Sequence, residues 1–122
     1  MSNAPHIIQQ FYELVKEADR ADIEEPGRSV EREFNAVLDY VLMHPDARED
    51  FIKAFMDIID EGILSPGLVE YCLHGLRWTE LKQKIQASLH SEKSERSRYF
   101  LKSILEAFED DWNMKDFYDR FS

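Results

Sequence analysis

Two side chains of this sequence have the spacing for shared acid–base or metal chemistry. Glu70 and His74 lie four positions apart, which on a helix places them one turn apart on the same face. A zinc or di-iron site needs further ligands, and no His-Glu-x-x-His or Glu-x-x-His element accompanies the pair. His6, His44 and His90 are too far apart to form a local motif. We therefore expect a structural contact between Glu70 and His74, with no metal, no cofactor and no catalytic residue.

The one cysteine, Cys72, lies close to His74 in the sequence. Side chains two positions apart on a helix diverge by about 200°, so the thiol and the imidazole cannot exchange a proton. The apolar neighbours of Cys72 predict a buried, free thiol. A single cysteine forms no intrachain disulfide, which fits a reducing compartment, and we expect the protein to be cytoplasmic.

Phosphate chemistry is not indicated, because the four glycines are isolated and follow no predicted strand. A basic stripe is possible in the second half of the chain. With a net charge of −10, however, the field of the whole molecule opposes binding to nucleic acid or to anionic lipid. No apolar run reaches the roughly 18 residues of a membrane span. The basic residues of the possible stripe are Arg77, Lys82, Lys84, Lys93, Arg96, Arg98 and Lys102.

Acidic side chains are the stronger functional signal. The chain has 25 Asp and Glu against 15 Lys and Arg, and the acids concentrate near residues 19–25, 57–61 and 106–111. Acidic helix faces are common solubility devices, but blocks on separate helices could also converge on one surface for a basic partner. The predicted partner-binding residues are Asp57, Asp60, Glu61, Glu106, Glu109, Asp110 and Asp111.

Helices must position these residues. Apolar residues recur every three or four positions, and no segment alternates with a period of two. The pattern predicts one all-α domain over residues 5–122, either a compact bundle or a short HEAT-like stack of antiparallel helices, while residues 1–4 are interpreted as an expression-tag remnant. We expect about six to seven helices: 5–22, from Ser29 to His44-Pro45, Asp46 to Gly62, from Ser65-Pro66, from Thr79 (as cap), from the end of a polar loop over 91–98 to Asn113, and a short last helix from Met114 to Phe121.

The stretch from Gly62 to Trp78 is the least charged part of the chain and predicts a central helix. Apolar residues at helical spacing surround most of its circumference, so the other helices should pack on it. The residues predicted to be largely buried are Phe34, Leu38, Phe55, Ile59, Tyr71, Leu76 and Phe108.

Within this stretch, Leu68-Val-Glu-Tyr-Cys-Leu-His-Gly-Leu-Arg-Trp78, followed by Thr79-Glu80-Leu81, resembles small all-helical immunity proteins encoded beside bacterial polymorphic toxins, such as those of contact-dependent growth inhibition. The resemblance implies a bacterial antitoxin that binds and neutralises the C-terminal domain of a cognate toxin, often a basic nuclease. It carries no functional residue over position by position. A monomer in complex with the toxin domain is the expected assembly.

Two other functions remain open at the level of the sequence. The chain could be a helical adaptor or a chaperone-like interaction module, which differs from an immunity protein only in its partner. It could also be a cryptic helical enzyme that uses Glu70 and His74, which would need a polar pocket around that pair.

Overall fold

The computed structural model describes residues 4–25, 29–62 and 66–122, and within these ranges the chain is helical and contains no strand. The all-α prediction is confirmed. The α-helices are α1 (Ala4–Glu24), α2 (Glu31–Leu42), α3 (Arg48–Glu61), α4 (Pro66–Leu76), α5 (Thr79–Ser91) and α6 (Glu95–Leu105). A short 3-10 turn, η1 (Pro45–Ala47), lies between α2 and α3, and two more, η2 (Glu106–Phe108) and η3 (Lys115–Phe117), come after α6. None of the helices in the described ranges combines the length and the apolarity that crossing a bilayer requires.

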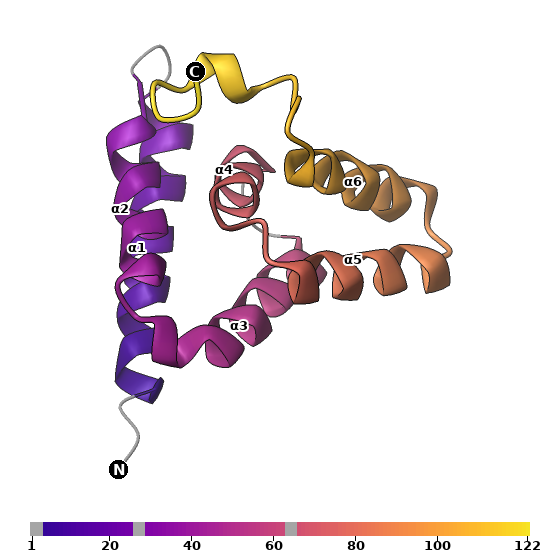
Figure 1. Cartoon of the computed structure of the whole chain (residues 1–122), viewed down its shortest axis with the longest axis horizontal. Coiled ribbons are helices and arrows are strands. Elements are labelled where there is room, and N and C mark those ends of the chain that lie inside the picture. Colours follow the sequence, from indigo (N-terminus) through magenta and orange to yellow (C-terminus); the bar gives the residue numbers. More distant parts are fainter. Residues whose placement is uncertain (1–3, 26–28, 63–65) are drawn as a thin grey trace.

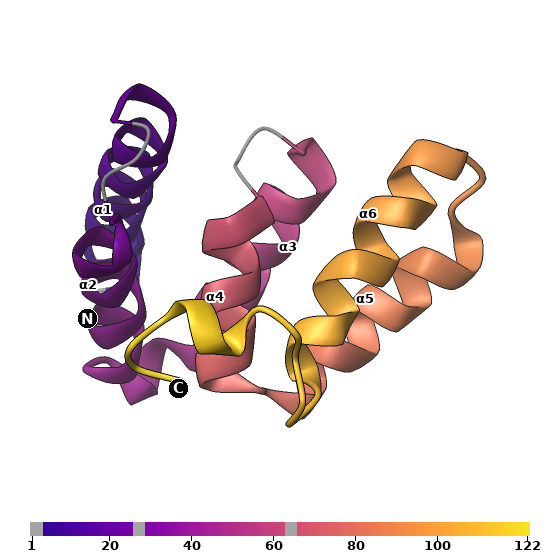
Figure 2. The ribbon, with the colours of Figure 1, turned by 90° about the horizontal axis from the view of Figure 1, so that it is seen from above.

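The helices form antiparallel pairs that lie side by side. The pair α1–α2 lies on one side, the pair α5–α6 lies on the other, and α3 and α4 run between them in opposite directions (Figure 2). After α6 the chain turns back past α4 and ends beside α1 and α2 (Figure 1). Extensive contact joins α1 to α2 and α5 to α6, while α4 packs on α2 and α6, and α3 packs on α1 and α5.

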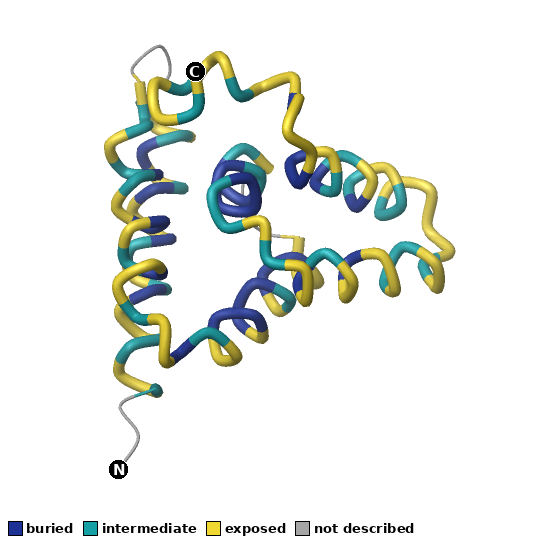
Figure 3. The backbone as a smooth tube through the Cα atoms, in the orientation of Figure 1, coloured by how far each residue is buried: buried dark blue, intermediate teal, exposed yellow. Residues whose placement is uncertain are grey.

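Helix α4 is the centre of the packing, as its composition predicts. Its buried side chains point in several directions, and Figure 3 shows it as the most continuously buried helix. It packs against α2, α6 and η2. Because an apolar helix gains stability from every covered side, it draws the other elements around it. The buried residues of α4 are Leu68, Val69, Tyr71, Cys72, Leu73 and His74.

Most of the predicted core residues are buried, and one is not. Leu76 is only partly covered, because it is the last residue of α4 and lies at the edge of the molecule beside exposed Arg77. The close approach of α2 to α4 explains a residue that periodicity alone does not: a Cβ atom on Gly75 would collide with Leu38, 3.0 Å from its Cδ1 and 3.3 Å from its Cγ. The predicted core residues found buried are Phe34, Leu38, Phe55, Ile59, Tyr71 and Phe108.

Helix ends were predicted with mixed success. Gly62 ends α3 as expected, with a φ of 64° and its N–H donating to the carbonyl of Ile58. Thr79 is not a cap but the first residue of α5, and Trp78 precedes it in an extended conformation. The polar loop is shorter than predicted, since Ser94 accepts a hydrogen bond from the N–H of Ser97 and starts α6 early.

At α2, Val30 occupies the position before the helix and makes no side-chain cap. The predicted cap, Ser29, stands one residue further out, where its hydroxyl accepts from the N–H of Glu31 at 3.4 Å. Ser65, predicted to cap α4, lies outside the described residues.

The C-terminal prediction is wrong in its secondary structure. Helix α6 ends at Leu105 rather than near Asn113, and the predicted last helix is a series of turns around η3. The turns let Tyr118 and Phe121 reach the ring of Tyr71, each with a centroid distance of 4.8 Å. In a regular helix the backbone N–H groups point along the helix axis. Here two N–H groups of the turns donate instead to a side chain of α2.

That side chain is Glu31. Its carboxylate accepts hydrogen bonds from the backbone N–H of Asp119 at 2.8 Å and of Arg120 at 3.0 Å, and from the hydroxyl of Tyr71 at 3.1 Å. Arg120 also donates to Asp39 at 2.8 Å. Partial burial acts to raise the pKa of Glu31, but the hydrogen bonds from Arg120, Asp119 and Tyr71 outweigh it and lower the pKa. We call this set of contacts the C-terminal latch.

Gly75→Ala should destabilise the fold although alanine is normally the better helix former. The collision with buried Leu38 opposes the propensity gain, and we expect the free energy of unfolding to fall by about 1–2 kcal/mol in urea denaturation. Leu38→Ala should cost less in the Gly75→Ala background than in the wild type, because it removes the colliding atoms. An increase in stability for Gly75→Ala would show that α2 and α4 are not in close contact.

Glu31→Gln should lower the free energy of unfolding by about 1–2 kcal/mol at neutral pH, since the amide replaces one acceptor oxygen of the C-terminal latch. The folded state lowers the pKa of Glu31, so its stabilisation is present above the unfolded pKa and is lost as pH falls through the folded pKa. The difference between wild type and Glu31→Gln should therefore shrink on acidification. Glu13→Gln, at an exposed position of α1, is the control. A difference in the free energy of unfolding between wild type and Glu31→Gln that stays constant with pH would contradict the latch.

Candidate partner-binding surface

Glu70 and His74 do not form the predicted contact. His74 is buried, and its Nδ1 lies 2.7 Å from the carbonyl oxygen of Ala107 in η2. Its ring packs against Trp112 and Phe121, with centroid distances of 4.9 and 4.7 Å. Burial lowers the pKa of His74, so the imidazole is neutral at physiological pH. The imidazole of His74 therefore contacts η2 and the C-terminal segment instead of Glu70.

Glu70 is half-buried beside Trp112. Burial raises the pKa of the Glu70 carboxyl, the Trp112 indole opposes that rise, and the Glu106 carboxylate adds to it. The indole Nε1 is buried and meets no acceptor with hydrogen-bond geometry in the described part of the chain. No group of three His, Cys, Asp or Glu side chains is arranged to hold a metal ion among the residues described.

Three of the seven bases of the predicted stripe make contacts within the fold. Arg98 donates to the carbonyls of Leu89 at 2.7 Å and Glu92 at 3.1 Å, which ties the end of α5 to the start of α6. Two further bases, Arg77 and Lys82, pair with acids of the turn after α6. The other four, Lys84, Lys93, Arg96 and Lys102, form no ion pair in the described structure, so the stripe keeps part of its positive charge.

The turn after α6 carries the second predicted acidic set, Glu106, Glu109, Asp110 and Asp111, and all four are exposed. Two of them already have basic partners. Asp110 pairs with Arg77, which also donates to the carbonyl of His74, and Glu109 lies 3.8 Å from the Nζ of Lys82. Part of the charge of this set is therefore neutralised inside the molecule.

The first acidic set, Asp57, Asp60 and Glu61, occupies the end of α3 and differs from the second. All three side chains are exposed, and none forms an ion pair in the described structure. Their field reaches a neighbouring helix: burial raises the pKa of the Tyr12 phenol, and the carboxylates of Asp57 and Glu61 raise it further. This set is a region of uncompensated negative charge.

The two acidic sets do not converge on one surface. Asp60 and Glu61 immediately precede Gly62, on the side where the chain enters α4, whereas Asp110 pairs with Arg77, just past the other end of α4. Figure 2 shows the end of α3 and the end of α6 at opposite edges of the molecule. Each set therefore has to be considered as a separate surface.

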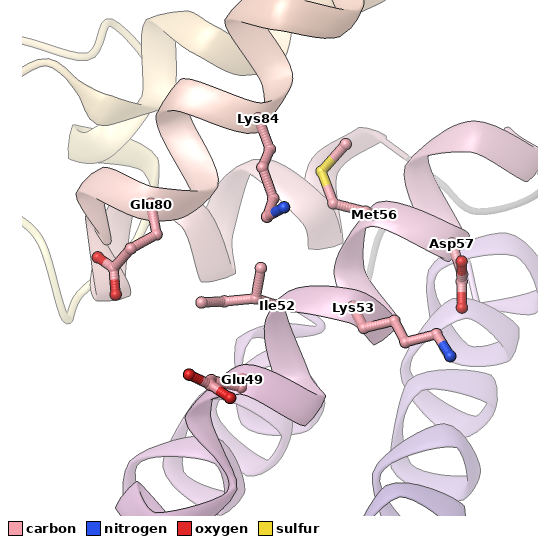
Figure 4. Close-up of a pocket in the computed structure, with 7 residues that line it drawn as sticks. All are labelled: Glu49, Ile52, Lys53, Met56, Asp57, Glu80 and Lys84. Carbon is pink, nitrogen blue, oxygen red and sulfur yellow. The ribbon is translucent and has the colours of Figure 1, made fainter.

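Three hollows surround the first set, and the sequence alone did not indicate them. Between α3 and α5 lies a groove of about 470 Å³, with Ile52 and Met56 on its apolar floor and side chains of both helices on its rim (Figure 4). The rim includes Asp57. Ile52 and Met56 are one turn apart on α3, so the floor follows the helix axis. The rim residues are Glu49, Lys53, Asp57, Glu80 and Lys84.

A second hollow of about 600 Å³ lies where α3 ends and is bounded by α4, α5 and α6, and a third of about 290 Å³ lies between α1 and α3. Asp57 lines the third as well as the groove of Figure 4, while Asp60 and Glu61 line the second. We call α3's acidic set and these hollows the α3 surface. Its acids, Glu49, Asp50, Asp57, Asp60, Glu61, Glu80 and Glu92, outnumber its bases, Lys53, Lys84 and Arg96.

One ion pair at the edge of this surface is internally satisfied. Arg48 donates to both carboxylate oxygens of Glu80, at 3.0 and 2.8 Å, and its guanidinium lies 4.5 Å from the ring centroid of Trp78. This bidentate contact joins the starts of α3 and α5. The negative charge available to a partner lies further along α3.

Comparison of the chain with protein-family models, with curated proteins and with solved structures finds no match. The function is therefore inferred from the residues, charge and shape of the α3 surface.

Cys72 is completely buried in α4, and burial raises its thiol pKa to about 12. Modification by a thiol reagent should therefore be slow in the native protein and fast in denaturant, because only opening of the core exposes a reactive thiolate. Gly75→Ala should speed the native reaction by lowering stability. Fast modification of the folded wild type would contradict the central position of α4.

Proposed function

We propose that the chain binds a basic partner protein through the α3 surface, and that this partner is a cognate toxin domain which the chain neutralises as an immunity protein. One observation carries the proposal. The last turn of α3 holds three exposed carboxylates without an ion pair in the described structure, and it contains no basic residue. Those carboxylates are Asp57, Asp60 and Glu61.

The position of these carboxylates is unfavourable for the isolated protein. The C-terminal end of a helix carries a partial negative charge, so acidic side chains there reduce helix stability and basic ones increase it. Acids needed only for solubility could stand anywhere on the surface. Three of them at this end, without counter-charges, favour a surface whose counter-charges come from another molecule.

Charge and shape support a protein as that partner. The apolar floor of Ile52 and Met56 offers contact area, while the carboxylates supply long-range attraction and discrimination among partners. Acidic groups can also occupy the places of nucleic-acid phosphates in the active site of a basic nuclease, which is the toxin class that the resemblance around α4 implies. The same proposal holds that a single copy of the chain binds the toxin domain in the cytoplasm.

The second acidic set has a smaller role in this proposal. Glu109 and Asp110 would have to exchange an internal base for one of the partner, so little net attraction is gained. Glu106 and Asp111, which are exposed and make no ion pair in the described structure, provide a control for the charge of α3 that is smaller by one carboxylate.

Asp57→Asn, Asp60→Asn and Glu61→Gln, combined in one variant, should raise stability while weakening function. Removing charge from the C-terminal end of α3 should raise the free energy of unfolding by about 0.3–1 kcal/mol per site. The same variant should associate with the toxin domain more slowly and with a weaker dependence on salt. The measurements are thermal melting, surface plasmon resonance with the domain co-purified from native cells, and protection of cells that express that domain.

Glu106→Gln with Asp111→Asn is the control, because it also removes exposed unpaired charge but does so away from the α3 surface. It should leave protection nearly unchanged. If the stable α3 variant still protects cells fully, the electrostatic mechanism is wrong. If the wild type protects against no co-purified toxin domain, the immunity function is wrong.

A further inference from the structure

The hollow where α3 ends has a chemistry that the proposed function does not yet assign. Elements distant in the sequence line it: the end of α3, the start of α4, the end of α5 and one side of α6. Its volume of about 600 Å³ is ample for one long side chain. The residues that line it are Ile59, Asp60, Glu61, Gly62, Pro66, Ser88, Glu92, Arg96, Ser97, Tyr99, Phe100, Leu101 and Ser103.

Acceptors and an aromatic ring dominate this lining. Asp60 and Glu61 come from the end of α3, and Glu92 comes from the connection between α5 and α6. One carboxylate oxygen of Glu92 is held by the N–H groups of Lys93 and Ser94, at 3.0 and 2.9 Å, which fixes the position of this side chain. Tyr99 is 77% exposed, so the face of its ring is accessible to a side chain that enters the hollow.

We propose that this hollow receives an arginine side chain of the partner protein. The inference rests on the proposed function and adds which side chain the α3 surface recognises. A guanidinium group is flat, stacks on an aromatic face and presents several N–H donors to carboxylates, so Tyr99, Asp60 and Glu61 can be used together. A lysine ammonium offers a point charge without the planar face and gains less from the same walls.

One basic residue, Arg96, also lines the hollow, and its removal should change the affinity in the opposite direction to removal of the acids. Arg96 lines the hollow but lies beyond ion-pair distance of every carboxylate in the described structure. Its charge reduces the attraction for an incoming cation without being neutralised by Asp60 or Glu92. Replacing it by glutamine should therefore strengthen binding of an arginine side chain, whereas a change that merely loosened the fold would weaken it.

The probe is the peptide acetyl-Ala-Ala-Arg-Ala-Ala-amide, titrated at millimolar concentration into the labelled protein and followed by NMR. Its counterpart, with citrulline in place of arginine, keeps the shape and loses the charge. We expect shift changes at the amides of residues 59–62 and 96–103 with the arginine peptide, and none with the citrulline peptide. A lysine peptide should bind the same place more weakly.

Matched variants separate the hollow from long-range attraction. Asp60→Asn with Glu61→Gln should weaken binding of the arginine peptide about fivefold, while Glu106→Gln with Asp111→Asn removes equal charge away from the α3 surface and should change it by less than about twofold. Tyr99→Phe should keep the affinity, and Tyr99→Ala should lower it. Arg96→Gln should raise it.

Equal losses in both acidic pairs would overturn the proposal, because the peptide would then respond to overall charge. Shift changes centred on the end of α1 or the turn after α6, or equal binding of the citrulline peptide, would overturn it too. Any of these results leaves the proposed function standing if the α3 variant still loses protection. Loss of the proposed function with retained peptide binding would instead mean that the hollow serves a different basic partner.

Discussion

The burial of α4 is the constraint on which the rest of the structure depends. Its apolar residues cover most of its circumference, so no single neighbour can shield it, and α2, α6, η2 and the C-terminal turns pack around it. Gly75 lets α2 approach closely enough for Leu38 to lie directly on the α4 backbone. The hydrophobic gain of this arrangement explains why a chain without regular repeats still forms side-by-side antiparallel pairs.

Polar contacts then decide where the ends of the chain go. The latch on Glu31 draws the last residues across α4, and the rings of Tyr118 and Phe121 complete the cover of Tyr71. The ion pair of Arg120 with Asp39 belongs to this latch, and a further one, Arg48 with Glu80, joins the starts of α3 and α5. The end of α3 is left without such a partner in the described structure.

The α3 surface thus combines two properties that stability alone does not explain. Its carboxylates stand at the helix end where they are least favourable, and hollows between packed helices lie on both sides of them. A surface of this kind is organised before any partner binds, because α3 and α5 are fixed by the core beneath and by Arg48 at one end. Pre-organisation of this sort reduces the entropy lost on binding.

The sequence by itself determined the helical class, the central place of α4 and most of the core, because apolar periodicity records which face of each helix is covered. It also identified the acids of α3. Only the tertiary structure decided that the two acidic sets lie apart, that His74 bonds to Ala107 rather than to Glu70, and that the last residues form turns. Periodicity is a local property, whereas hollows, ion pairs and the latch on Glu31 arise between residues as far apart in the chain as Glu31 and Arg120, whose meeting no local pattern encodes.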